Sequence, residues 1–144
     1  MFGYLKEIVK KADRMRAAER VRDFMIWQHN NALDCNTGEM TDEQMSNADL
    51  VETTFLRGAA LAATGWFGLR DYDQALFLIN ILGMYKGLSY EQASRELMRT
   101  ILDEELERRA SYVGYLSMSQ YLTNRRSNTF SNSLAELQKA CGNY

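Results

Sequence analysis

The spacing of hydrophobic residues divides the chain into several helices. Residues 3–31 carry apolar side chains at intervals of three and four, which predicts one long helix. The apolar face changes after Met15, and residues 24–27 are apolar on all sides. Because a helix that is apolar all round is buried all round, we expect the second half of this helix to lie deeper in the protein than the first.

Two uncharged apolar runs, Gly58–Leu69 and Gln74–Tyr85, make residues 55–87 the most hydrophobic part of the chain. Each run is shorter than the about 20 residues that cross a bilayer, so we interpret both as buried helices. The first run belongs to a predicted helix over about residues 42–65, whose small residues allow a neighbouring helix to approach closely. The second predicts a helix from about residue 74 to Gly87, which we place at the centre of the protein.

Capping pairs, in which a polar residue is followed three positions later by Gln or Glu, predict further helix starts. The helix after residue 89 keeps its apolar periodicity to about residue 115, and one or two short helices complete the chain. Residues 33–41 have turn chemistry and are predicted to form a loop or a short hairpin. The capping pairs named above are Thr41 with Gln44, Asp71 with Gln74, Ser89 with Gln92, Ser117 with Gln120, and Ser133 with Glu136.

Length and composition favour one all-α domain. A chain of 144 residues fits a single domain, and 46% of its residues are hydrophobic. It contains no proline, the residue that most strongly interrupts helices. We therefore expect residues 1–144 to form a single helical bundle of about five or six helices around the central apolar helix.

The chain has no feature of a secreted protein. Lys6 and Glu7 interrupt the first apolar residues, unlike the uncharged core of a secretory signal. Two cysteines, Cys35 and Cys141, are too few for a disulfide framework. We expect a cytoplasmic protein with free thiols.

Residues with enzymatic chemistry are scarce. His29 is the only histidine, which excludes metal sites that need several histidines. His29 could act as a base for Cys35, but a lone histidine near a helix C-terminus is more commonly a cap. Asp34, Asn36 and Gly38 are similar to the start of a calcium loop, but the glycine is at the fifth rather than the sixth position and Met45 stands where the final glutamate is required. We predict no catalytic residue, no metal and no cofactor, so the chain is not expected to be an enzyme.

The C-terminal part of the sequence combines arginine with tyrosine. No acidic residue occurs between Arg108 and Ala135, whereas the preceding acidic cluster is expected to form pairs such as Glu104–Arg108 along a solvated helix face. Tyrosine and arginine are enriched in the residues that dominate protein interfaces. The predicted partner-binding residues are Arg108, Arg109, Tyr112, Tyr115, Tyr121, Arg125 and Arg126.

These features predict a non-enzymatic protein-interaction module, a small cytosolic regulator, inhibitor or adaptor that binds a protein partner or itself. Small acidic helical proteins of bacteria and their mobile elements often act in this way, which supports the prediction by analogy. The alternative is a nucleic-acid-binding protein that uses the same arginines and tyrosines, since arginine with stacking aromatics binds single strands. A pI of about 5.5 disfavours that alternative.

A membrane surface is a further candidate partner, because the first helix is amphipathic and basic at its start. Its acidic residues weaken the attraction to anionic lipid, so we expect a core helix and no membrane partner.

Overall fold

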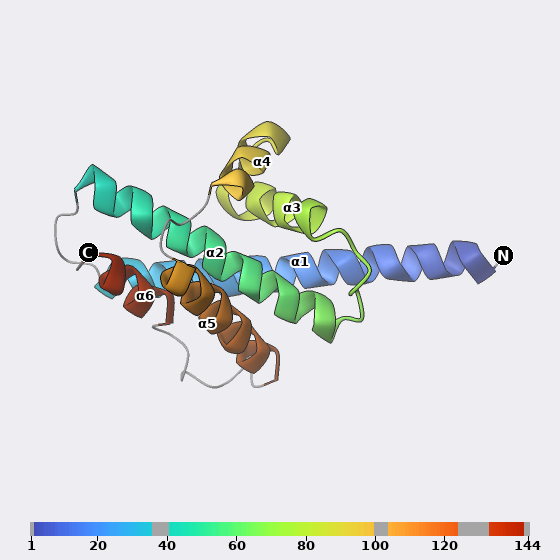
Figure 1. The fold of residues 1–144 in the computed structure, drawn as a ribbon. Coiled ribbons are helices and arrows are strands. Elements are labelled where there is room, and N and C mark those ends of the chain that lie inside the picture. Colours follow the sequence, from blue (N-terminus) through green and yellow to red (C-terminus); the bar gives the residue numbers. More distant parts are fainter. Residues whose placement is uncertain (1, 36–40, 100–103, 124–132, 143–144) are drawn as a thin grey trace.

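The computed structural model describes residues 2–35, 41–99, 104–123 and 133–142, which form six α-helices and no strand (Figure 1). The prediction of an all-α protein with five or six helices is confirmed. None of the helices in these residues has a stretch that is long and apolar enough to cross a bilayer. The helices are α1 (Phe2–Cys35), α2 (Asp42–Trp66), α3 (Gln74–Lys86), α4 (Tyr90–Met98), α5 (Glu104–Thr123) and α6 (Ser133–Gly142).

Helix α2, rather than α3, is at the centre of the bundle. It packs along α5 over an extended contact and also touches α1, α3 and α6 (Figure 1). Helix α3 packs mainly against α1 and α4 through one side, where Phe77 and Ile81 are buried, while Leu76 remains 43% exposed. The sequence pattern placed α3 at the centre because an apolar residue on the exposed side of a helix looks the same as a buried one.

Two glycines allow α2 and α5 to approach until their backbones touch. A Cβ atom at Gly58 of α2 would overlap the carbonyl of Ser111 in α5, and a Cβ atom at Gly114 of α5 would overlap the carbonyl of Phe55 in α2. The predicted close packing at the small residues of α2 is therefore confirmed, and α5 supplies a matching small residue.

The two halves of α1 have different surroundings. Residues 3–12 are all exposed, and this part of the helix projects beyond the other helices (Figure 1). Val21, Phe24 and Met25 are fully buried. The expectation that the second half lies deeper is confirmed. The expectation that the first half is a core helix is wrong, because its apolar side chains are left uncovered.

Two predicted boundaries are wrong because helix α1 continues further, and a later helix ends sooner, than the apolar pattern indicates. Helix α1 extends to Cys35, so Leu33 and Asp34 are helical and cannot form the strand of a hairpin. The single helix predicted for residues 90–115 is two helices, since α4 ends at Met98 and Arg99 has an extended backbone (φ −71°, ψ 137°). Residues 36–40 and 100–103 lie outside the described residues.

Capping side chains fix the ends of α3 and α4. Ser89 and Gln92 form the predicted capping box, and Gly87 ends α3 in the left-handed conformation (φ 67°) that glycine adopts most readily. The N-cap of α3 is Asp73, whose carboxylate accepts two backbone N–H groups, and not the predicted Asp71. Ser117 does not start a helix but is buried inside α5, where its hydroxyl bonds to that of Ser133 at 3.0 Å.

We predict that Gly58→Ala and Gly114→Ala each lower the free energy of unfolding by about 1–3 kcal/mol, because the added methyl group meets backbone that cannot rotate away. The better helix propensity of alanine, about 1 kcal/mol, offsets only part of this loss. Gly65→Ala is the control in the same helix, since a Cβ atom there meets nothing within 4 Å. Urea unfolding followed by circular dichroism should show the control to be at least as stable as the wild type; equal stability of all three variants would contradict the close contact.

Candidate functional site

Four of the seven predicted partner-binding residues lie together on the outer side of α5. Residues three and four apart share one side of a helix, and the side chains at these positions are exposed, with Tyr112 at 62% and Tyr115 at 45%. Leu116, 39% exposed, extends the same surface. We call this surface the α5 face, which consists of Arg108, Arg109, Tyr112, Tyr115 and Leu116.

The opposite side of α5 is held firmly against the rest of the protein. Ala110, Gly114 and Met118 are buried there, and Gly114 touches the backbone of α2. The α5 face is therefore presented on a helix whose position is fixed by close backbone packing.

Tyr121 lies away from the α5 face. It is half-buried, and its ring packs 5.3 Å from the ring of Phe24 in the core. Arg125 and Arg126 lie outside the described residues. The structure therefore brings together Arg108, Arg109, Tyr112 and Tyr115.

The charges at the start of α5 form a solvated helix face, as predicted. Arg108 Nη2 lies 3.7 Å from Glu104 Oε2, and both side chains are more than 80% exposed. An ion pair this exposed contributes little to stability. Arg108 can therefore exchange this intrahelical partner for another group at small cost.

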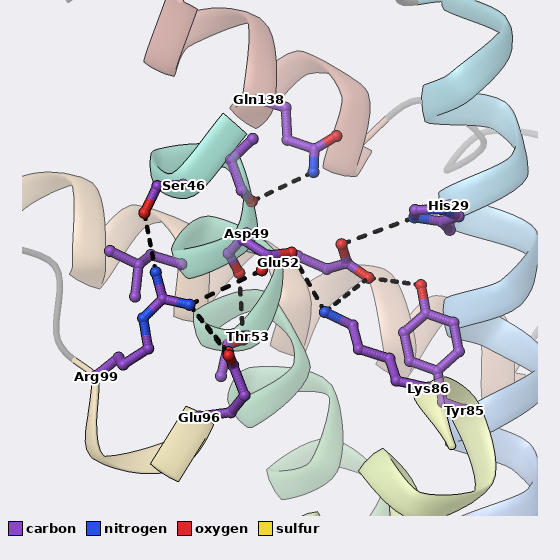
Figure 2. A network of polar contacts seen from close by, with 12 residues as sticks. His29, Ser46, Asp49, Glu52, Thr53, Tyr85, Lys86, Glu96, Arg99 and Gln138 are labelled. Carbon is purple, nitrogen blue, oxygen red and sulfur yellow. Dashed lines mark hydrogen bonds and ion pairs between the residues drawn. The ribbon is translucent and has the colours of Figure 1, made fainter. Parts of the chain in front are cut away.

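A second polar feature is a network around the buried Glu52, which joins α1, α2 and α3 (Figure 2). Glu52 on α2 is 3% exposed. Tyr85 on α3 donates a hydrogen bond of 2.5 Å from its hydroxyl to Glu52 Oε1, and Lys86 Nζ lies 4.0 Å from the same oxygen. His29 Nδ1 on α1 lies 3.7 Å from Glu52 Oε2.

The outer part of the network extends the contacts to the end of α4. Lys86 Nζ lies 3.4 Å from Asp49 Oδ1, and Arg99 reaches Asp49 Oδ2 at 3.8 Å. Arg99 also bonds to Glu96 at 3.1 Å and to Ser46 at 2.9 Å. The extended residue after α4 is thereby attached to the first turns of α2 (Figure 2).

The network keeps Glu52 charged in spite of its burial. Burial raises the pKa of a carboxyl group, but the contacts with His29, Lys86 and Tyr85 outweigh this effect and hold the pKa of Glu52 below its usual value. The contact with Glu52 likewise raises the pKa of His29, against the opposing effect of burial. Burial and the neighbouring carboxylate raise the pKa of Tyr85, which keeps its hydroxyl protonated as a donor.

The prediction that His29 caps the C-terminal end of a helix is wrong. His29 is not at the end of a helix, because α1 continues to Cys35, and its polar neighbour is Glu52 rather than a terminal carbonyl. Cys35 follows six residues later in the same helix, about 9 Å further along the axis, and its side chain lies outside the described residues. Within the described residues, no three His, Cys, Asp or Glu side chains are grouped in a way that would hold a metal ion.

Sequence reasoning missed Glu52, although the chain carries a signal for it. Ala48, Val51 and Phe55 are apolar and buried at helical spacing, and Glu52 falls on the same side of α2. An acidic residue inside an apolar stripe indicates a buried charge that needs a partner. Which residues supply the partner depends on how α1 and α3 pack on α2, and the sequence does not contain this information locally.

Comparison with protein-family models, with curated proteins and with solved structures finds no match to this chain. The Glu52 network connects helices of the bundle, and the α5 face is exposed and contains residue types that are common in protein interfaces.

We predict that Glu52→Gln lowers the free energy of unfolding by about 2 kcal/mol, because the amide keeps the size of the side chain but leaves His29 and Lys86 without their buried counter-charge. Asp49→Asn is the matched control in the same helix and the same network. The Asp49 side chain is 47% exposed, so its loss should cost under about 1 kcal/mol. Urea unfolding at neutral pH measures both, and equal losses would contradict the structural role of Glu52.

We also predict that the stabilisation contributed by His29 depends on pH. A raised pKa means that the folded state favours protonated His29, so its contribution is complete below the ordinary pKa of 6.5 and is lost as the pH rises through the raised value. The wild type should therefore exceed His29→Asn in stability at mildly acidic pH, above the lowered pKa of Glu52, by more than at alkaline pH. Urea titrations at both pH values test this; a difference that is the same at both would exclude the pair.

Proposed function

We propose that this protein is a non-enzymatic protein-interaction module, a small cytosolic regulator, inhibitor or adaptor. The observation that carries the proposal is the α5 face, in which two arginines and two tyrosines are exposed together on one side of a helix. The partner is another protein or a second copy of the chain. The proposal assigns no catalytic residue, metal or cofactor to the protein.

The chemistry of the α5 face supports this function. Tyrosine offers a large amphipathic contact area with only two rotatable side-chain bonds, so it loses little conformational entropy when a partner binds. Arginine adds planar donors that suit carboxylates of a partner. Because Gly114 and Gly58 fix α5 against α2, the face is already organised before a partner arrives, which lowers the entropic cost of association.

We predict that a protein partner retained by the wild-type chain is lost when the α5 face is truncated by the double substitution Arg108→Ala with Tyr112→Ala. Residues of this kind at interface centres contribute about 2 kcal/mol or more, which corresponds to about 30-fold in affinity. The measurement is affinity purification with each variant, followed by titration of the recovered protein. Light scattering of the pure chain reports whether the partner is a second copy.

The matched control for this experiment is Arg95→Ala with Tyr90→Ala on α4. Tyr90 is 64% exposed, and Arg95 forms an exposed pair with Glu91 at 3.8 Å, as Arg108 does with Glu104. The control removes the same atoms from a different surface and should leave the interaction unchanged. Equal binding by both double variants would exclude the α5 face as the binding surface.

Nucleic-acid binding is the second candidate, because Arg108 and Arg109 lie beside the exposed rings of Tyr112 and Tyr115. Glu104, Glu105 and Glu107 occupy the first turn of the same helix and would repel phosphates, which favours a protein partner. Titration of short RNA and DNA against salt separates the two candidates. Two phosphate contacts give a slope of about −2 in log affinity against log salt for duplex DNA, and the absence of binding at low salt removes this candidate.

A further inference from the structure

The projecting half of α1 carries a continuous apolar surface that the rest of the described chain leaves exposed. Its large members are 48–73% exposed, and all of residues 3–12 are exposed. We call this surface the α1 stripe, which consists of Tyr4, Leu5, Ile8, Val9, Ala12 and Met15.

The α1 stripe points away from the protein's own core. The side of α1 that packs into the bundle is marked by the buried residues Ala17, Val21, Phe24 and Gln28. Consecutive residues of an α-helix are about 100° apart, so the stripe is centred about 180° from that side. The bundle therefore does not cover the stripe, although Met15 at its inner end borders a hollow with Tyr72, Phe77 and Met84.

The width of the stripe favours an extended surface over a single partner helix. Its outermost members, Tyr4 and Val9, are separated by about 140° around the helix axis. The seam covered by one partner helix in a coiled coil is narrower, whereas a helix at a lipid–water boundary buries a broad apolar face. Tyr4 lies at the edge of the stripe, where its ring and hydroxyl suit such a boundary.

The charges around the stripe favour an anionic surface. Residues 3–16 contain five basic and two acidic residues, and the residues that border the stripe most closely are Lys11 and Arg16. Glu7 and Asp13 lie further round the helix. Glu19 and Asp23 continue the exposed side of α1 beyond the stripe, but Arg20 and Arg22 lie beside them, and Arg22 pairs with Asp23 at 3.1 Å. A second copy of α1 would bring like charges together, whereas anionic headgroups would neutralise them.

In contrast to the expectation from the sequence that no membrane is bound, we propose that the α1 stripe binds the surface of a membrane that contains anionic lipid. The helix axis lies parallel to the membrane, the apolar side chains enter the boundary between headgroups and acyl chains, and Lys11 and Arg16 contact lipid phosphates. The bundle remains on the aqueous side because it packs on the opposite side of α1. The cytoplasmic leaflet, which carries anionic lipid, fits the proposed location of the protein.

The test is flotation of the full-length protein with vesicles of two compositions, phosphatidylcholine alone and equal parts of phosphatidylcholine and phosphatidylglycerol. We expect binding to the anionic vesicles to be on the order of 10- to 100-fold tighter than to the neutral ones, and to weaken as salt is added. The triple variant Leu5→Gln, Ile8→Gln and Val9→Gln should lose this binding.

A matched control distinguishes the stripe from general surface hydrophobicity. Leu61, Leu76 and Met98 are 50%, 43% and 81% exposed on other helices, and their joint replacement with Gln should leave vesicle binding unchanged. A double charge reversal, Lys11→Glu with Arg16→Glu, should lower the affinity for anionic vesicles by at least about 10-fold. All substituted side chains are exposed, and circular dichroism verifies that each variant is folded.

Three results would overturn the proposal. The first is no binding of the wild type to anionic vesicles at low salt, and the second is equal binding by the stripe variant and the control. The third is self-association of the wild type that disappears in the stripe variant without any vesicle binding, which would assign the stripe to a protein interface instead. The α5 face is on a different helix, so the first two results do not bear on the proposed protein partner; the third would place self-association on α1 rather than on the α5 face.

Discussion

The backbone contact between α2 and α5 is the constraint on which the rest of the structure depends. Gly58 and Gly114 each occupy a position where a Cβ atom would overlap the carbonyl of the other helix. This contact brings the side chains on both sides of the seam close enough to interlock. Phe55 of α2 then stacks 5.8 Å from Phe24 of α1, and Phe24 in turn packs 5.3 Å from Tyr121 of α5. Three helices thus share one aromatic core, and the outer side of α5 is held in a fixed position.

Polar contacts add to the apolar packing of the remaining helices around α2. Glu52 connects α1 and α3 to α2, and Arg99 ties the end of α4 to the same helix. Helix α6 is positioned in a similar way: Gln28 of α1 accepts the backbone N–H of Leu134 at 3.2 Å, and Gln138 donates to the carbonyl of Ala48 at 3.3 Å. Buried polar groups tolerate few alternative arrangements because each must keep its partner.

The two exposed surfaces result from the same organisation. Since α5 packs on α2 through the side that carries Ala110, Gly114 and Met118, the residues of the α5 face remain on the outer side. Since α1 is longer than the bundle that covers it, its first half projects and keeps its apolar residues in contact with solvent (Figure 1). Exposed apolar side chains on a helix that extends from a well-packed core are costly unless another surface covers them.

The sequence by itself determined the helical class, the approximate residue ranges of α2 and α3, the capping box at Ser89, and the pairing of Glu104 with Arg108. These features depend on residues within one or two helical turns of each other, so their spacing in the chain is sufficient information. The sequence also determined that Arg108, Arg109, Tyr112 and Tyr115 share one side of a helix, because they lie within eight consecutive residues at spacings of three and four. Only the tertiary structure decided that α2 rather than α3 is central, that Glu52 is buried beside His29, Tyr85 and Lys86, and that Tyr121 faces the core. It also decided that the apolar first half of α1 is uncovered. In each of these cases the deciding contact joins residues far apart in the chain, and an apolar or charged position has the same local pattern whether a distant helix covers it or not.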